Sequence, residues 1–239
     1  LQDFYTKQLE RVKANSVIHY HANIHKALKY AIKLDLISSN PADKIERPKK
    51  ERFMANFYDA DEVNRLFEIS KGTKLEIPIL FGAFYGMRRS ETLGMKWDAI
   101  DFERDTITIR HTLTTVALDG KRITVAEDRT KNKSSMRTLP LVPFVKERLL
   151  ELKAEQEENR RLCGRSYVKD YTGYVCINEI GDIIKPNYVS CGFPKLLEEH
   201  GLRRVRYHDL RHSCASLLLA NGVPMKQIQE WLGHSDIST

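Results

Sequence analysis

The chain has 239 residues, of which 41% are hydrophobic and 30% charged, a composition typical of a globular protein with one large or two small domains. No apolar run approaches the length of a membrane span, and the start LQDFYTKQLE lacks the apolar core of a signal peptide. These features exclude a membrane or secreted protein and predict a cytoplasmic one. The formal net charge of +7 permits a polyanionic partner without establishing one.

Residues 1–37 have the apolar spacing of two helices, the second with inward positions from Ile18 to Ile32. They are too few to bury both faces, so they are either the remaining part of a helical domain that begins upstream or a helical hairpin packed on the main body. Residues 38–53 contain prolines and many cations without apolar periodicity, which predicts an exposed basic linker.

A capping box, Asp59-x-x-Glu62, predicts the start of the next helix. A very apolar helix over 75–85 should end at Gly86, where glycine permits a sharp turn. Arg88 then falls in the first turn of the following helix, where backbone amides also point.

Alternating residues over 105–115, 121–125 and 136–141 predict three strands that together form one small antiparallel sheet. The polar loop between the last two strands carries Lys131 and Lys133. A lysine in such a loop is by itself compatible with simple solvation.

Pro143 should open a long helix that ends near residue 161, with a charged outer face. Residues 174–177 are a candidate strand. A further helix is expected over 187–200, broken or kinked at Gly192 and Pro194.

The segment LRRVRYHD brings three arginines next to His208. His208, Arg211 and His212 have the spacing of one helix face, and small or apolar residues follow them, which predicts a buried helix with a charged end at a cleft. Asn221-Gly222 should cap this helix, and a second helix should run from Pro224 to Gly233.

The reversal would return His234 to the neighbourhood of His208 and Arg211, forming a site for an oxyanion such as phosphate. Two alternatives compete with this interpretation. His208 and His212 have the spacing of zinc ligands, but no general-base glutamate lies between them and Arg211 would lie against the cation. The second alternative is a buried helix whose histidines take no part in catalysis or ligand binding. The four cysteines, which are Cys163, Cys176, Cys191 and Cys214, form no C-x-x-C pair and are expected to be reduced.

The motifs His208-x-x-Arg211-His212 and Leu232-Gly233-His234 resemble the C-terminal signature of the tyrosine recombinases, the integrases of temperate phages and conjugative transposons. GMRRSETLGMKW resembles the first arginine motif of that family, which is weak alone and strong together with the C-terminal signature. Thr130-Lys131 followed by RTLP resembles the pattern around the family's catalytic lysine.

This resemblance implies a mainly α fold with a small antiparallel β-sheet (α+β). It implies a partial helical core-binding domain at 1–37, a basic interdomain linker at 38–53 and a catalytic domain at 54–239, closing around the duplex as a clamp. The expected partner is double-stranded DNA at a core recombination site of a mobile element, bound by a homo-tetramer on synapsis. No metal or other cofactor is required.

By the same resemblance, the catalytic residues are Arg88, Lys131, His208, Arg211 and His234. Glu91 and His212 would support them, and Lys133 competes with Lys131. The cations expected to contact DNA are Arg47, Lys49, Lys50, Arg89, Lys133, Arg203, Arg204 and Arg206.

In this interpretation two guanidiniums, Arg88 and Arg211, neutralise the charge that develops on the nonbridging phosphate oxygens. Lys131 protonates the leaving 5′ oxygen, His208 handles the proton of the nucleophile, and His234 holds a phosphate oxygen. The family's nucleophile is a tyrosine, which forms a 3′-phosphotyrosyl link that conserves bond energy for rejoining.

That tyrosine should stand a short distance beyond His234, and the sequence ends at Thr239. Tyr207 is expected to pack beside the helix entrance instead. We therefore expect a C-terminally truncated integrase that binds its core site but cannot cleave unless a longer neighbour supplies the tyrosine, with weakened tetramer assembly. The rival functions are a non-catalytic DNA-binding or architectural protein with a relic phosphate pocket and a phosphodiesterase with a histidine nucleophile.

Overall fold

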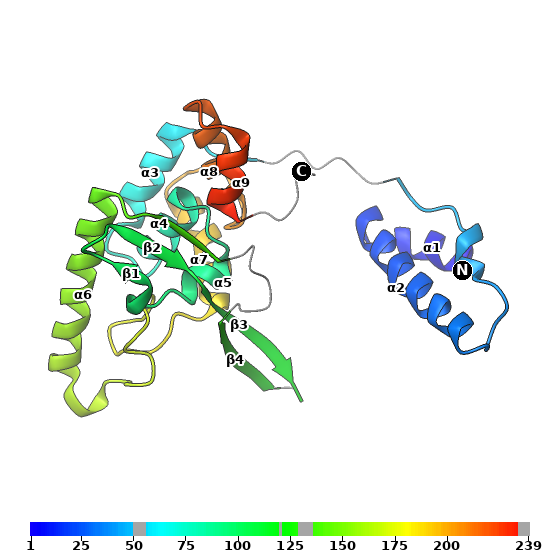
Figure 1. Cartoon of the computed structure of the whole chain (residues 1–239), viewed down its shortest axis with the longest axis horizontal. Helices are drawn as coiled ribbons and strands as arrows, with labels where there is room; N and C mark the ends of the chain where they lie inside the picture. The colour runs from blue at the N-terminus through cyan, green and yellow to red at the C-terminus, as the bar shows by residue number, and fades with distance from the viewer. Residues whose placement is uncertain (50–55, 120, 129–135, 234–239) are drawn as a thin grey trace. The chain divides into compact units, whose positions relative to one another are not determined.

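A computed structural model describes residues 1–49, 56–119, 121–128 and 136–233 (Figure 1). The chain divides into two units, Leu1–Met54 and Ala55–Thr239. Within the part that is described, no helix is both long and apolar enough to cross a membrane.

The first unit contains the two predicted helices, α1 (Gln2–Leu9) and α2 (Ala14–Lys33). Tyr5 of α1 and Val17 of α2 are buried between them, and the Tyr5 hydroxyl lies 3.2 Å from Nδ1 of His21. Much of the apolar side of α2 stays only half-buried, which agrees with a unit too small to cover it.

The beginning of the predicted linker 38–53 is structured and packs against α2. The Asn40 side chain accepts a hydrogen bond from the Ala42 amide (3.0 Å) and donates one to the carbonyl of His25 (3.2 Å). Asn40 thereby caps the short 3-10 helix η1 (Pro41–Lys44), and Ala42 is fully buried. A cap residue followed by proline favours this local turn over an extended, solvated chain.

The second unit is mainly helical. Its helices are α3 (Ala60–Ser70), α4 (Glu76–Phe84), α5 (Arg89–Leu93), α6 (Pro143–Cys163), α7 (Pro186–Glu199), α8 (Asp209–Ala220) and α9 (Met225–Leu232), with short 3-10 turns η2 (Trp97–Ala99) and η4 (Gly164–Ser166). The predicted capping box of α3 is confirmed, because the Asp59 carboxylate accepts from the Glu62 amide and the Glu62 carboxylate accepts from the Asp59 amide.

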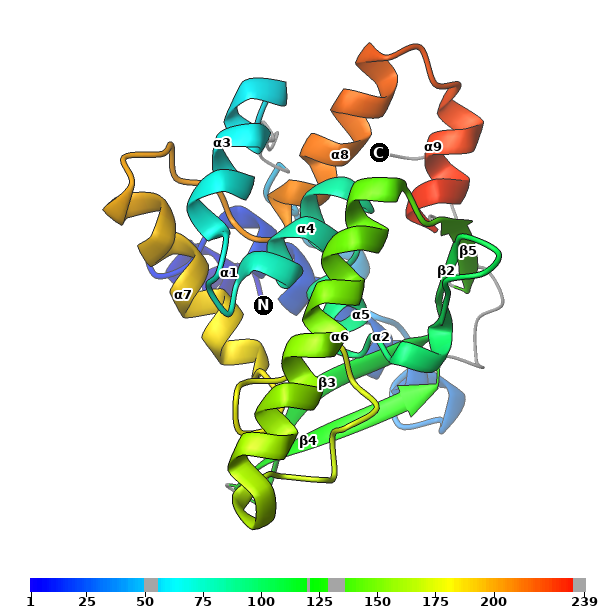
Figure 2. The same cartoon turned by 90° about the vertical axis from the view of Figure 1, so that its left-hand side faces the viewer.

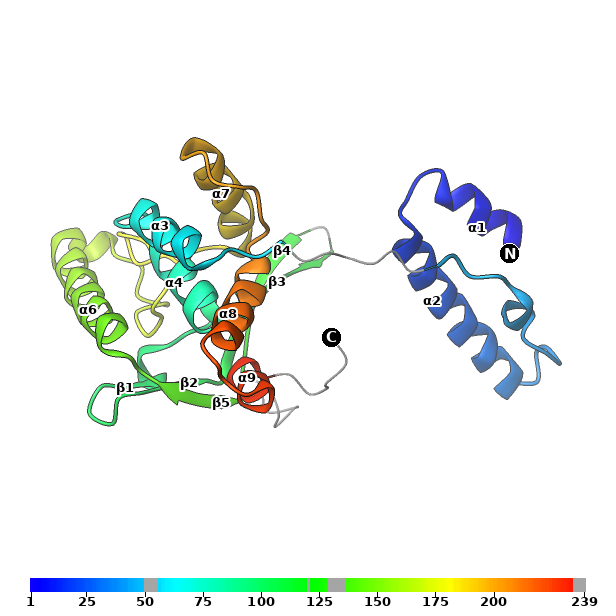
Figure 3. The ribbon, with the colours of Figure 1, turned by 90° about the horizontal axis from the view of Figure 1, so that it is seen from above.

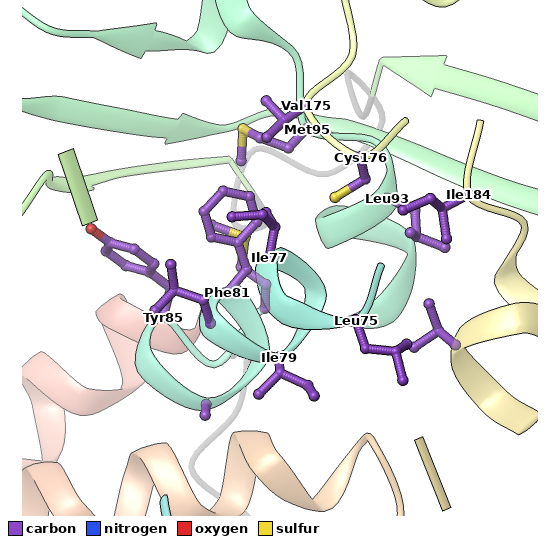
Figure 4. Close-up of a cluster of buried hydrophobic side chains, with 14 of the residues drawn as sticks. Leu75, Ile77, Ile79, Phe81, Tyr85, Leu93, Met95, Val175, Cys176 and Ile184 are labelled. Atoms are coloured by element: carbon purple, nitrogen blue, oxygen red, sulfur yellow. The ribbon is translucent and has the colours of Figure 1, made fainter. Parts of the chain in front are cut away.

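Helix α4 is the centre of the core. Every residue from Ile77 to Ala83 is buried, so the helix is covered on all sides, as its lack of polar positions requires (Figure 4). Side chains from other segments pack around it, among them Leu93 of α5, Met95 just after α5, and Val175 and Cys176 of a loop that is distant in the sequence. The turn that leaves α4 is therefore held on a rigid base.

The strands form two sheets, so the prediction of one sheet is wrong. One has the order β1-β2-β5, made of β1 (Ile100–Asp101), β2 (Thr106–Ile109) and β5 (Arg137–Pro140); the other is the ribbon of β3 (His111–Leu118) and β4 (Lys121–Asp128) (Figures 1 and 3). The chain leaves the first sheet at Arg110, where no strand is formed. Residues 105–115, which were predicted as one strand, contain β2 and the start of β3. These two strands belong to different sheets, because β2 pairs with β5 and β3 pairs with β4.

Two other expectations also need correction. Residues 174–177 form isolated bridges, Lys96 with Tyr174 and Ile177 with Ile183, instead of a strand. Helix α7 is continuous through Pro194, because its buried side chains, among them Phe193 and Leu197, hold it against the core despite the hydrogen bond that proline cannot make.

Helices α8 and α9 form the predicted hairpin, with Gly222 at φ +78° between them and Gly233 at φ +67° ending α9. The prediction of a buried α8 holds for its first half only, since Leu219 is 52% exposed. The end of α9 contacts β5 (Figure 2). This contact brings the last described residues beside the start of that strand.

Candidate functional site

Arg88 is the N-cap residue of α5, directly after the Gly86 turn. Its backbone N–H donates to Oε2 of Glu91 (3.0 Å), and its Nη1 donates to Oε1 of the same carboxylate (2.8 Å). The Glu91 side chain is 1% exposed, whereas that of Arg88 is 31% exposed. The buried carboxylate therefore holds the Arg88 side chain in place and leaves part of its guanidinium accessible to solvent.

A second arginine, Arg137 at the start of β5, also binds this carboxylate. Its Nη2 donates to Oε2 of Glu91 (3.1 Å), and both side chains are almost fully buried. In the sequence, Arg137 stands out only as part of the RTLP pattern, and no role was predicted for it. The feature that could have indicated its burial is the alternation along β5. Arg137 lies two positions before buried Leu139 and faces the same side of the strand.

Arg211 of α8 is held by two backbone carbonyls. Its Nη1 donates to the oxygen of Gly86 (2.6 Å) and its Nη2 to the oxygen of Leu232 (2.5 Å). Gly86 has φ +60°, and a Cβ there would lie 2.3 Å from Cδ2 of Leu232, so only glycine fits this turn. The turn after α4 and the end of α9 thus meet at one guanidinium.

The cluster is electropositive, because three guanidiniums surround one carboxylate. Burial raises the pKa of Glu91, but Arg137 and the N–H groups of Arg88 lower it more, so the net shift is downward. Burial, then Arg88 and Arg137, lower the pKa of Arg211 to about 9, which leaves it protonated at neutral pH. A site with surplus positive charge and oriented donors suits an oxyanion.

His208 is the N-cap residue of α8 and is exposed, and its ring lies 5.8 Å from that of His212 in an edge-to-face arrangement. Partial desolvation, then His212 and Arg211, lower the pKa of His208, and Arg88 contributes in the same direction. The ring is therefore neutral at pH 7 and can accept a proton.

The structure brings Arg88, Glu91, His208 and Arg211 together, as predicted. Lys50, Lys131, Lys133 and His234 lie outside the described residues. Tyr207 packs as expected: its buried hydroxyl donates to the carbonyl of Pro78 (2.6 Å) and lies 3.1 Å from Oγ1 of Thr92.

The predicted DNA-contacting cations differ in their surroundings. Arg203 binds the Glu62 carboxylate and the Phe57 carbonyl, and Arg206 binds the Asp209 carboxylate. Arg89 donates to the hydroxyl of Ser190. The remaining described cations of this set, Arg47, Lys49 and Arg204, are exposed.

Among residues 1–49, 56–119, 121–128 and 136–233, no three His, Cys, Asp or Glu side chains are grouped as a metal site would need. The zinc interpretation would need further ligands for His208 and His212, and the cations Arg211 and Arg88 both act on His208.

Residues 56–239 match the phage integrase family, and the chain belongs to this family of tyrosine recombinases. It is 30% identical over 251 residues to a tyrosine recombinase XerC-like protein of Caldanaerobacter subterraneus subsp. tengcongensis, in a match that covers 100% of this chain and 64% of the relative. It is 28% identical over 239 residues to tyrosine recombinase XerD of Oceanobacillus iheyensis, covering 95% of this chain and 70% of that protein. The chain thus spans less than two thirds of the first of these relatives.

The fold is that of solved integrases. The Tn1549 transposon integrase in complex with transposon right end DNA superposes with a TM-score of 0.81 at 18% identity, covering 99% of this chain and 76% of that one. A lambda integrase dimer bound to a COC′ core site superposes with a TM-score of 0.66 at 17% identity, covering 98% and 75%.

Proposed function

We propose that the protein is a site-specific DNA recombinase that carries out integration or excision of a mobile element. The whole protein that contains residues 1–239 would cleave and rejoin DNA strands through a 3′-phosphotyrosyl intermediate. The observation that carries the proposal is that Arg88, bonded to buried Glu91, and Arg211, bonded to the Gly86 carbonyl, lie in one electropositive cluster beside the His208 imidazole.

In this mechanism the scissile phosphate binds over the guanidinium cluster. Arg88 commits one Nη1 contact to Glu91 and keeps further N–H donors on its exposed side. As the nucleophile attacks, charge grows on the nonbridging oxygens, and guanidiniums already fixed by carbonyls and a carboxylate stabilise it without reorganising. His208 accepts the proton of the attacking hydroxyl. Lys131 and His234 keep their predicted roles as general acid and phosphate ligand.

The proposed partner is double-stranded DNA, and the proposed active assembly is a tetramer on synapsis. Support comes from the similar integrases, whose structures are a transposon integrase with DNA and lambda integrase as a dimer on a core site and a tetramer on a Holliday junction. Residues 54–239 would form the catalytic domain. Residues 1–37 would supply part of a core-binding domain, and the linker 38–53 would place the cations Arg47 and Lys49 against the phosphate backbone.

The test uses the full gene product that contains residues 1–239 and nicked duplexes taken from both ends of the element that surrounds its gene. A covalent adduct that survives SDS and maps by mass spectrometry to a tyrosine supports the recombinase. Hydrolysed ends without an adduct would support a phosphodiesterase, and retained DNA without either product would support an architectural protein.

Arg88→Ala and Arg89→Ala form a matched pair for this assay, because they remove the same charge from adjacent residues. We expect Arg88→Ala to lower the rate of adduct formation by about 10²- to 10³-fold, the usual loss when a fixed transition-state donor is removed. Arg89→Ala, which removes a hydrogen bond to Ser190, should change it far less. Equal losses would contradict the assigned role of Arg88.

A further inference from the structure

Arg137 is a buried charged residue of the RTLP pattern to which the proposed mechanism assigns no role. It joins three parts of the site: its Nη2 binds Glu91, Glu91 binds Arg88, and its Nη1 would lie 3.0 Å from a Cβ on Gly233. Gly233 immediately precedes His234, and β5 begins just after the segment that carries Lys131. The Arg137 side chain thus lies between the carboxylate that binds Arg88 and the turn that ends α9.

The charge balance gives this connection a chemical role. If Glu91 faced Arg88 alone, the two would form a neutral pair, and much of the positive charge of Arg88 would be compensated by its own carboxylate. With Arg137 also bound to Glu91, two guanidiniums share one carboxylate, and the three groups together carry a net charge of +1. Arg88, with its side chain 31% exposed, then keeps its charge for an anion above it.

The geometry also restricts the carboxylate. Oε2 of Glu91 accepts from Arg137 and from the backbone N–H of Arg88, which leaves Oε1 directed at Nη1 of Arg88. Rotation of the carboxylate would break these bonds together. Lysine at 137 could supply the charge but not the fork that reaches both Glu91 and the Gly233 turn.

We propose that Arg137 is a positioning residue for strand cleavage, which neutralises and orients Glu91 so that the guanidinium of Arg88 faces the scissile phosphate with its charge available. This inference rests on the proposed recombinase function. It assigns Arg137 no contact with DNA.

The experiment measures single-turnover adduct formation and DNA affinity for the full gene product on the nicked duplexes described above. We expect Arg137→Met to lower the rate constant by roughly 10- to 100-fold, since small misplacements of a binding group cost that much. DNA affinity should stay within about threefold, because many cations share the backbone contacts. Arg137→Lys should recover part of the rate.

Arg148→Met is the matched control. Arg148 is another poorly exposed arginine bound to glutamates, with Nε 2.7 Å from Oε1 of Glu76, and its ion-pair partners lie outside the Arg137 cluster. This variant should lose stability like Arg137→Met and keep the rate per folded molecule. If both variants show the same rate per folded molecule, Arg137 is only structural and the inference is wrong.

A double-mutant cycle with Glu91→Gln separates positioning from general damage. If Arg137 acts through Glu91, its replacement in the Glu91→Gln background should change the rate little further. Fully additive losses would overturn the inference, and the cycle can be run with Arg137→Lys if Arg137→Met does not fold. Absence of an adduct with the unmodified protein would instead overturn the proposed function, and this inference with it.

Discussion

Among the single residues of the candidate site, Glu91 is the one that binds both Arg88 and Arg137. Its carboxylate accepts from Arg88 and Arg137 while being 1% exposed, so it is a buried charge that depends on both partners. Removing one member of such a group leaves the others buried and uncompensated. Glu91 therefore affects stability as well as chemistry.

Glu91→Gln should lower the free energy of unfolding by roughly 3–5 kcal/mol at pH 7. The lowered pKa of Glu91 means that its contribution is fully present above its unfolded value of about 4.5 and is lost as the pH falls through the folded value. Urea unfolding of both proteins at several pH values should show the difference shrinking on the acid side. Glu68→Gln, at an exposed position, is the control; a difference independent of pH would contradict the assignment.

Arg203 and Arg204 are adjacent cations with different surroundings. Arg203 is bound to Glu62 and Phe57, whereas Arg204 is exposed and its side chain makes no hydrogen bond or ion pair within the described part of the chain. We expect Arg204→Ala to reduce the slope of log K against log salt for DNA binding by about 0.9, the value for one phosphate contact. Arg203→Ala should lower the melting temperature and leave that slope nearly unchanged. The reverse pattern would place Arg203 on the DNA.

Sequence reasoning named the residues of the candidate site that lie beside a turn or a helix start, and it assigned no role to Arg137. Arg88, His208 and Arg211 stand in short patterns beside a turn or a helix start, and the structure brings them together. Arg137 lies in the RTLP pattern, but its role follows from its pairing with a glutamate 46 residues away, which single-sequence patterns do not show.

At the scale of elements, the helices followed from apolar periodicity, a capping box and glycine ends, all of which are local signals. The sheets did not, because strand pairing is a non-local choice. Nothing in the alternation of 105–115 reveals that the chain changes partner at Arg110, from β5 to β4.

The Gly86 turn between α4 and α5 gives a test at this scale. Gly86→Ala adds a Cβ at φ +60° that would lie 2.3 Å from Leu232, whereas Gly222→Ala adds one at φ +78° with no atom within 4 Å. The backbone strain of about 1–3 kcal/mol is common to both. Thermal unfolding should therefore show a larger loss for Gly86→Ala, and DNA cleavage should fall only there. Equal losses would mean that Leu232 moves aside at little cost.

At the scale of the whole molecule, the chain consists of two units with separate interiors. The main buried cluster extends from Tyr58 to Leu210 and contains no residue of the first unit. The first unit buries its own small set, which includes Tyr5 and Val17. Each unit therefore has its own source of stability.

A fragment of residues 55–239 should consequently unfold in one cooperative transition at the denaturant midpoint of that unit in the whole chain. It should bind DNA more weakly and with a smaller salt slope, because Arg47 and Lys49 are absent from it and each phosphate that they neutralise accounts for about 0.9 of the slope. Denaturant unfolding and salt titrations of both proteins provide the measurement. A fragment without a cooperative transition would show that the first unit is required for folding.

Arg211 reaches the carbonyl of Gly86 across 125 positions of the sequence and that of Leu232 across 21. During synthesis, the turn after α4 leaves the ribosome long before the helices that complete its surroundings. The nascent protein can therefore complete the hydrogen bonds around this guanidinium only when α8 and α9 have been made.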